Sequence, residues 1–122
     1  MEDLQAGDLT IAVSEVASGL RLDWRGKSNN REPSKVLAPF FSLAAKRAAE
    51  LSQKPVVEMH FEALEHFNSS TITALIRFIQ SARGKAVRIA FVYDPNLKWQ
   101  RLSFDALRVF EKGDKAFELV TV

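Results

Sequence analysis

The sequence predicts a single α/β domain, a mixed β-sheet of about five strands with helices mainly on one face. Segments in which apolar and polar residues alternate indicate strands, and segments with apolar residues at helical spacing lie between them. The predicted order is strand, strand, helix, strand, helix, strand, helix, strand. Strand–helix–strand units imply right-handed parallel crossovers. Because several strands alternate in polarity and are not wholly apolar, we expect the helices mainly on one face of the sheet. At 122 residues the chain forms one domain, residues 1–122.

The first two predicted strands, within residues 9–25, form a hairpin. Apolar residues alternate with polar or small ones in both segments. The short turn at residues 17–19 joins them as antiparallel neighbours. The residues predicted to point inward are Leu9, Ile11, Val13, Leu20, Leu22 and Trp24.

A polar loop, residues 27–34, leads into the first predicted helix. Apolar residues then recur at helical spacing as far as Leu51. Pro39 cannot lie deep inside a regular helix, so the helix begins near it or its first turn is distorted. Pro55 ends this segment, and a third strand follows. Its inward residues are predicted to be Val57, Met59 and Phe61.

The second half of the chain continues the alternation. A second helix is predicted within residues 70–84, with Gly84 at its C-terminal end. A fourth, central strand is predicted within residues 86–94, and a third helix follows the turn after it. Residues 116–122 are predicted to form an edge strand. The apolar stripes are Ile72, Leu75, Ile76 and Ile79 in the second helix and Leu102, Ala106, Val109 and Phe110 in the third.

The composition excludes several classes of function. The chain has no cysteine, which rules out disulfides, zinc thiolate sites and cysteine nucleophiles. Its net charge is +2 and its Lys and Arg residues are scattered, which argues against a nucleic-acid partner. The acidic N-terminal stretch is not a signal peptide, and no apolar run approaches the roughly 20 residues that span a bilayer. We therefore expect a cytoplasmic domain without direct membrane insertion.

No catalytic or cofactor-binding constellation is visible in the sequence. His60 and His66 are the only histidines, and three glutamates lie near them, but no ligand spacing supports a metal site. Strand geometry instead places His60 and two of these glutamates on one solvated strand face. No Gly-rich phosphate loop occurs. We expect no metal, no cofactor and no catalytic residue. The glutamates are Glu58, Glu62 and Glu65.

The run Asn68, Ser69, Ser70 and Thr71, between a strand and the second helix, is the main candidate site. Asn68 or Ser69 could simply cap the helix, because a helix start leaves its first N–H groups unpaired. The alternative is a switch. A helix start tolerates anions, so a phosphate on Ser69 would spare the fold and repel a partner packed over this end. The residues alone leave both interpretations open.

The order of elements and the stretch FNSSTITALIRFI resemble the STAS domain of anti-sigma factor antagonists. That family has an Asp-Ser-Ser/Thr-Gly stretch before the helix, and its first hydroxyl is phosphorylated. The match places Asn68 on the Asp, Ser69 on the phosphate acceptor, Ser70 on the second hydroxyl and Thr71 on the Gly. The chain therefore departs from the pattern at the first and last positions.

A closer resemblance is to STAS-like bacterial biofilm-regulating phosphoproteins, which act with a diguanylate cyclase and a kinase/phosphatase pair. Their Asn-Thr-Ser-Ser stretch matches Asn68 and places Ser69 on the phosphorylated Thr. The stretches RGKSNN and VYDPN also resemble loops of that family. The resemblance implies a STAS-like fold and a regulator without catalytic activity, which binds its partner when Ser69 is unphosphorylated. That partner would be an anti-sigma-factor-type kinase or a diguanylate cyclase.

A second loop, with Asp94 and Asn96, follows the fourth strand. Because the carboxyl ends of parallel strands meet at one edge of a sheet, we expect this loop and the loop at Ser69 to lie together. An alternative function is therefore a small-ligand or enzymatic pocket between the loops at Ser69 and Asp94. The predicted partner-binding residues are Asn68, Ser70, Thr71, Asp94 and Asn96.

Overall fold

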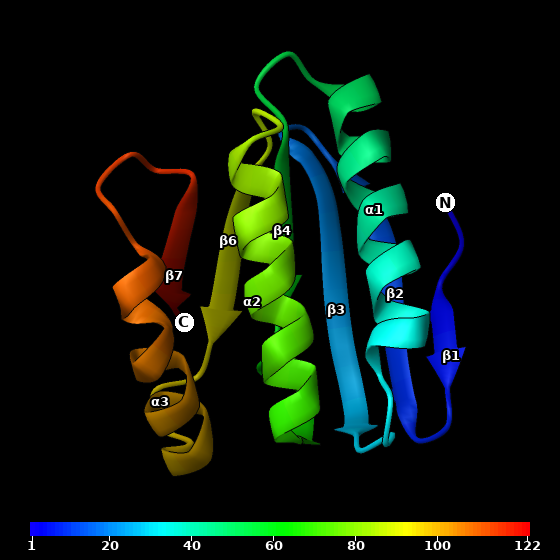
Figure 1. The fold of residues 1–122 in the computed structure, drawn as a ribbon, viewed down its shortest axis with the longest axis vertical. Coiled ribbons are helices and arrows are strands. Elements are labelled where there is room, and N and C mark those ends of the chain that lie inside the picture. Colours follow the sequence, from blue (N-terminus) through cyan, green and yellow to red (C-terminus); the bar gives the residue numbers. More distant parts are fainter.

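The computed structural model describes all of residues 1–122, and its order of elements confirms the predicted mixed α/β fold (Figure 1). The strands are β1 (Leu4–Ala6), β2 (Leu9–Val16), β3 (Gly19–Ser28), β4 (Val56–His60), β5 (Leu64–Phe67), β6 (Arg88–Tyr93) and β7 (Phe117–Thr121). The helices are α1 (Ser34–Leu51), α2 (Ser69–Arg83) and α3 (Lys98–Asp105), followed by a 3₁₀-helix, η1 (Ala106–Phe110).

The strands form one mixed sheet in the order β1-β2-β3-β4-β6-β7, with β5 also paired to β3. β1, β2 and β3 are antiparallel neighbours, which confirms the predicted hairpin. β3, β4, β6 and β7 run parallel to one another. The prediction that β7 is an edge strand is confirmed, and β6, predicted to be central, lies between β4 and this edge strand.

The sheet has seven strands, not about five, because β1 and β5 are too short to show a period of two in sequence. β3 is ten residues long and β4 only five. β4 pairs with the first half of β3, so the backbone groups near Ser28 need another partner. β5 supplies it, after a register shift between Gly26 and Lys27.

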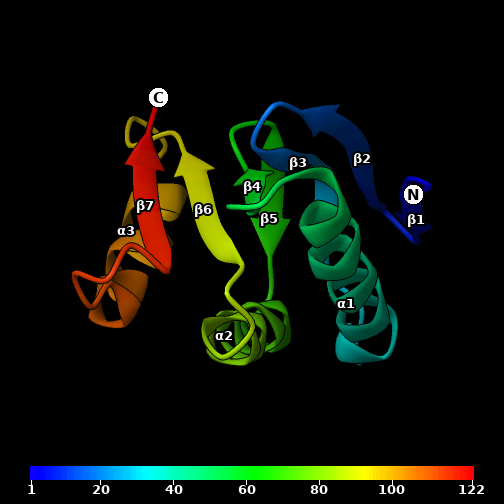
Figure 2. The ribbon, with the colours of Figure 1, turned by 90° about the horizontal axis from the view of Figure 1, so that it is seen from above.

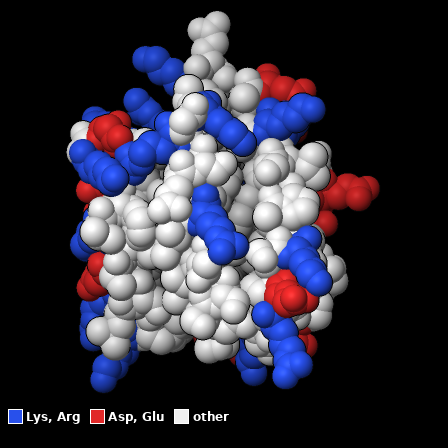
Figure 3. All heavy atoms as spheres, in the orientation of Figure 1, with Lys and Arg blue, Asp and Glu red and all other residues white.

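The helices cover one face of the sheet, and the other face carries none (Figure 2). This arrangement confirms the prediction from strand alternation. Lys and Arg are interspersed with Asp and Glu around the helix-covered face and do not form one basic patch (Figure 3). None of the helices combines the length and apolar character needed to cross a membrane.

The core lies between the sheet and the helices and is rich in aromatic rings. Phe61 is at its centre, with its ring 5.0 Å from that of Trp24 and 4.8 Å from that of Phe104, measured between centroids. Close aromatic packing of this kind adds stability beyond the buried area. The predicted inward residues of β2, β3 and β4 are buried, except Val13, which is half-buried.

Two helical stripes differ from the prediction. In α2 the buried side includes Thr71 and Phe78, while Ile72 and Ile76 are only half-buried. At the third helix Leu102 and Val109 are 59% and 72% exposed, and Phe104 and Leu107 point inward instead. The chain changes there from α3 to η1. A 3₁₀-helix has about 3.0 residues per turn, so one α-helical period cannot describe both parts.

Pro39 lies inside α1, five residues after the helix begins at Ser34. The helix therefore starts before the proline, and Pro39 takes an exposed position. Its missing N–H removes one bond of the helical ladder.

The connection between η1 and β7 is fastened to the end of α2 by Arg83. The guanidinium donates to the carbonyl of Phe110 at 2.7 Å and pairs with the carboxylate of Asp114. The hydrogen bond from Arg83 lowers the pKa of Asp114, and the amide of Ala116 adds to the effect. Because a lowered pKa keeps the carboxylate of Asp114 charged, its ion pair with Arg83 persists into the acidic range.

Candidate functional site

The predicted site lies at the edge of the sheet where the parallel strands end and where α1, α2 and α3 begin, at the lower end of Figure 1. A helix N-terminus carries partial positive charge and free N–H groups. Neither α1, α2 nor α3 has an acidic residue in its first turn. The edge therefore favours anionic groups.

Asn68 is the N-cap of α2. Its Oδ1 accepts the amide N–H of Thr71 at 2.9 Å, and its Nδ2 donates to the carbonyl of Asn30 at 2.8 Å. One side chain thus caps the helix and holds the loop after β3. The sequence left Asn68 and Ser69 as alternative caps of α2, and Asn68 has that role, so the two serines that follow it are not needed as caps.

Ser28, Asn68 and Thr71 form a buried polar latch between β3 and α2. Thr71 Oγ1 donates to Asn68 Oδ1 at 2.8 Å, so Ser28 Oγ donates in its 2.7 Å contact with Thr71 Oγ1. Ser28 is 1% exposed and Thr71 0%. Thr71 was predicted to contact a partner, but its side chain is buried and its hydroxyl joins α2 to β3.

Ser69 and Ser70 are both exposed on the first turn of α2. Neither hydroxyl makes a hydrogen bond within the chain, and the one side chain that bonds to this pair is Thr73, whose Oγ1 donates to the backbone carbonyl of Ser69 at 3.1 Å. Two hydroxyls beside unpaired N–H groups at a helix start are open to solvent, to a partner or to modification. The latch keeps this turn in place without using either of them.

The second predicted loop is an Asp-Pro turn that α3 fastens to the sheet. Asp94 Oδ1 accepts the amide of Asn96 at 2.9 Å, and the amide of Asp94 donates to Gln100 Oε1 at 2.8 Å. The buried Gln100 also donates to the carbonyls of Phe61 and Leu64. Asp94 is half-buried and Asn96 exposed, so Asn96 is the freer of the two to meet a partner.

The two loops lie at the same edge, as predicted, but they are not in direct contact through hydrogen bonds. Aromatic packing joins the elements next to the two loops. Phe67, at the end of β5, and Trp99, in α3, meet edge to face with their ring centroids 5.2 Å apart. Asn68 instead bonds to the loop after β3. The groove beside Ser70 is lined by α2 and the start of α1, and Asp94 is not part of it.

The alternative of an enzymatic pocket gains no support from these contacts. His66, the nearest histidine in sequence to Ser69, is exposed on β5 and makes no hydrogen bond to the hydroxyl. His60 lies on the helix-free face, with Nε2 3.2 Å from Glu58 and Nδ1 3.2 Å from Glu62. No group of three or more acidic and histidine side chains is arranged to hold a metal ion.

Sequence reasoning missed two residues that position the site, Ser28 and Gln100. Ser28 stands two residues after Gly26 and four after Trp24, in the buried phase of β3, so continued alternation identifies it. Gln100 has no such signal. A buried glutamine is recognised only by the backbone carbonyls that it reaches, which come from a distant part of the chain.

The cap of α2 gives a first testable expectation. Asn68→Ala should lower the free energy of unfolding by about 1–2 kcal/mol, because it removes the cap and the bond to Asn30. Asn68→Asp keeps a capping oxygen and should lose less. Urea denaturation measures both, and equal losses for the two variants would contradict the assigned role of Oδ1.

Comparison with known proteins identifies the fold of the chain. No family model matches the chain, and no curated protein matches it in sequence. Solved structures do match, and they define the class of fold as that of anti-sigma factor antagonists, that is, STAS-like. At these low identities the likeness concerns the fold alone.

One match is an anti-sigma factor antagonist from Mycobacterium paratuberculosis, 17% identical, covering 96% of this chain and 90% of that one, with a TM-score of 0.61. Another is a chain in the complex of the diguanylate cyclase SiaD with its activator SiaC from Pseudomonas aeruginosa, 17% identical, covering 98% of each chain, with a TM-score of 0.59. Apo-SiaC from the same organism is 18% identical, with a TM-score of 0.57, and covers 99% of this chain and 98% of that one.

Proposed function

We propose that this protein is a cytoplasmic regulator that binds a partner protein at the edge carrying Ser69 and is switched by phosphorylation of that serine. The observation that carries the proposal is the state of Ser69. It is exposed at the start of α2, and its hydroxyl is unused because Asn68 caps the helix. The fold that the chain shares with an anti-sigma factor antagonist and with SiaC supports a binding role without catalysis.

The physical basis of the switch is that a phosphate on Ser69 would leave the fold stable but would weaken the binding of a partner at this surface. Ser69 is the first residue of α2, where unpaired N–H groups and the helix dipole favour negative charge. The latch lies beneath this turn and uses neither serine. A partner packed over the same turn would meet up to two added charges that it must desolvate, and its affinity would fall.

The proposed partners follow from the same fold likeness. They are a kinase and a phosphatase that set the state of Ser69, and an output protein of the anti-sigma factor or diguanylate cyclase type. Ser70 and Asn96 present exposed polar groups at this edge, and Asn68 and Asp94 lie half-buried beside them. We propose that these four residues contact the unphosphorylated protein's partner.

The test begins with affinity purification from the native host, using tagged Ser69→Ala and Ser69→Asp proteins. The affinity of each recovered partner is then measured for the unmodified protein and for protein with phosphoserine encoded at position 69. We expect phosphorylation to weaken binding at least about tenfold, which is a loss of about 1.4 kcal/mol. Ser14→Asp, an exposed charge on β2, is the matched control and should leave binding unchanged. Equal affinities with and without the phosphate would refute the switch.

A further inference from the structure

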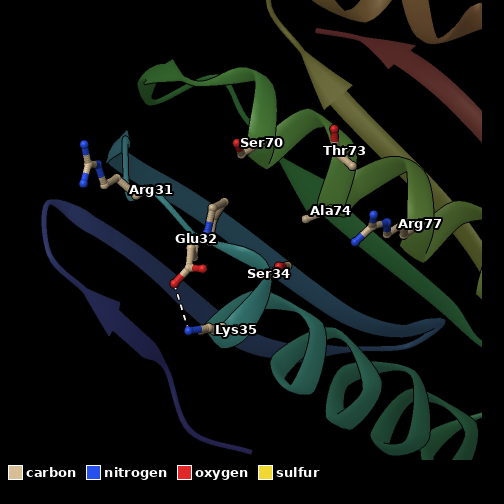
Figure 4. Close-up of a pocket in the computed structure, with 9 residues that line it drawn as sticks. Arg31, Glu32, Ser34, Lys35, Ser70, Thr73, Ala74 and Arg77 are labelled. Atoms are coloured by element: carbon tan, nitrogen blue, oxygen red, sulfur yellow. Dashed lines mark ion pairs between the residues drawn. The ribbon is translucent and has the colours of Figure 1, made fainter.

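A groove lies between the start of α1 and the first two turns of α2, with a volume of about 260 Å³. Ser70 stands on one wall, and Ser34 stands on the other, as Figure 4 shows. Ser69 is not among the residues that line it. The two adjacent serines therefore face different surroundings.

The groove carries excess positive charge. Lys35 is paired with Glu32 at 2.8 Å, which neutralises both. Arg31 and Arg77 are exposed, and neither makes an ion pair or a side-chain hydrogen bond within the chain. An exposed arginine without a carboxylate keeps its planar set of donors free, and that set fits phosphate oxygens. Of the two, Arg77 extends along the groove in Figure 4, whereas Arg31 points outward at its mouth.

Helix geometry aims Arg77 at Ser70. The two residues lie seven positions apart on the same face of α2, about 10 Å along the axis. Side chains in a helix tilt toward its N-terminus, so Arg77 leans back over Ala74 toward the first turn. A phosphoryl group on Ser70 extends into the same space from the other end. Ser69, one position earlier, is rotated about 100° away from this line.

We propose that Ser70 is a second modification site, whose phosphoryl group is bound within the chain by the Arg77 groove. The phosphate comes from a nucleoside triphosphate. The bond between Ser70 Oγ and the γ-phosphorus forms, and the bond to the β,γ-bridging oxygen breaks. The nucleoside diphosphate leaves, and the hydroxyl proton passes to a base of the kinase. A phosphate on Ser70 is thus held by its own domain, whereas one on Ser69 faces the partner.

The second pKa of the phosphate tests this inference in the isolated protein. Phosphoserine is encoded at position 70 or at position 69, and each phosphate is titrated by ³¹P NMR. A cation in contact with the phosphate favours its dianion, so Arg77→Gln should raise the pKa of the phosphate on Ser70 by about one unit. The same substitution should leave the phosphate on Ser69 unchanged. Arg88→Gln, an exposed arginine on β6, is the matched control and should affect neither.

An unchanged titration of the Ser70 phosphate in the Arg77→Gln variant would overturn the proposal, as would an equal change at both serines. Arg77 is exposed and makes no contact that the fold depends on, so the variant should fold, and circular dichroism checks that it does. No partner enters this measurement. Its outcome is therefore independent of the Ser69 switch, which is tested by binding.

Discussion

Replacing Gly26 with alanine is expected to lower the free energy of unfolding by more than about 3 kcal/mol, because a positive φ and a steric clash combine there. The φ of Gly26 is +83°, a conformation that residues with a Cβ rarely adopt. A Cβ at this position would lie 2.0 Å from the carbonyl oxygen of Asp8. That oxygen belongs to the backbone and accepts the amide of Lys27, so it cannot move aside cheaply.

Gly26 also lies where β3 changes its neighbour in the sheet from β4 to β5. From Gly26 to Ser28, β3 pairs with β5, and the register shifts between Gly26 and Lys27. Two residues after Gly26, Ser28 forms its hydrogen bond to Thr71 under α2. A distortion at Gly26 should therefore loosen the edge around Ser69 as well as weaken the sheet.

Chemical denaturation measures the effect, and Gly84→Ala is the matched control. Gly84 has a negative φ, and the nearest atom to a Cβ there would be the Ser81 carbonyl oxygen at 3.9 Å. Its replacement should change stability by no more than about 0.5 kcal/mol. A Gly26→Ala protein as stable as the control would show that the β3 register does not need a glycine.

The second large effect is expected for Thr71→Val, which keeps the shape of the side chain and removes its hydroxyl. Ser28 Oγ then loses its acceptor, and Asn68 Oδ1 loses one of its two donors. An unsatisfied buried polar group costs about 1–3 kcal/mol, so we expect a loss of about 2 kcal/mol by urea denaturation. Amide exchange should also become faster in the first turn of α2.

Two comparisons isolate the latch as the cause. Thr73 is exposed on the same helix, so Thr73→Val should change the free energy of unfolding by no more than about 0.5 kcal/mol. Adding Ser28→Ala to Thr71→Val removes the other hydroxyl, and the double variant should lose less than the sum of the two single losses. Strict additivity would contradict the coupling between Ser28 and Thr71.

The sequence predicted the fold where periodicity was long enough to be visible. In β3, Leu20, Leu22 and Trp24 are buried as their alternation indicates. β5 has only four residues and shows no such period. It pairs with the end of β3, which extends beyond the part that β4 covers. The stripe of the third helix was misplaced because α3 turns into η1 at Ala106, which changes the angle between successive side chains.

The candidate site shows the same division. Its location was predictable, because a run of Asn and hydroxyl residues between a strand and an amphipathic helix predicts a helix start, and parallel strands end at one edge. The sequence did not predict which residues of this run are buried and which are exposed. Thr71, predicted to contact a partner, faces inward, whereas Ser69, predicted to be the phosphorylation site, faces outward.

The sequence by itself determined the class of fold, the position of the hydroxyl run and the absence of cysteine-based sites, since these depend on local pattern and composition. Only the tertiary structure decided that Asn68 caps α2, that Ser28 and Thr71 are buried together, and that Ser70 faces the Arg77 groove. The physical reason is distance along the chain. Ser28 and Thr71 are 43 residues apart, and their hydrogen bond exists only once α2 has packed onto β3.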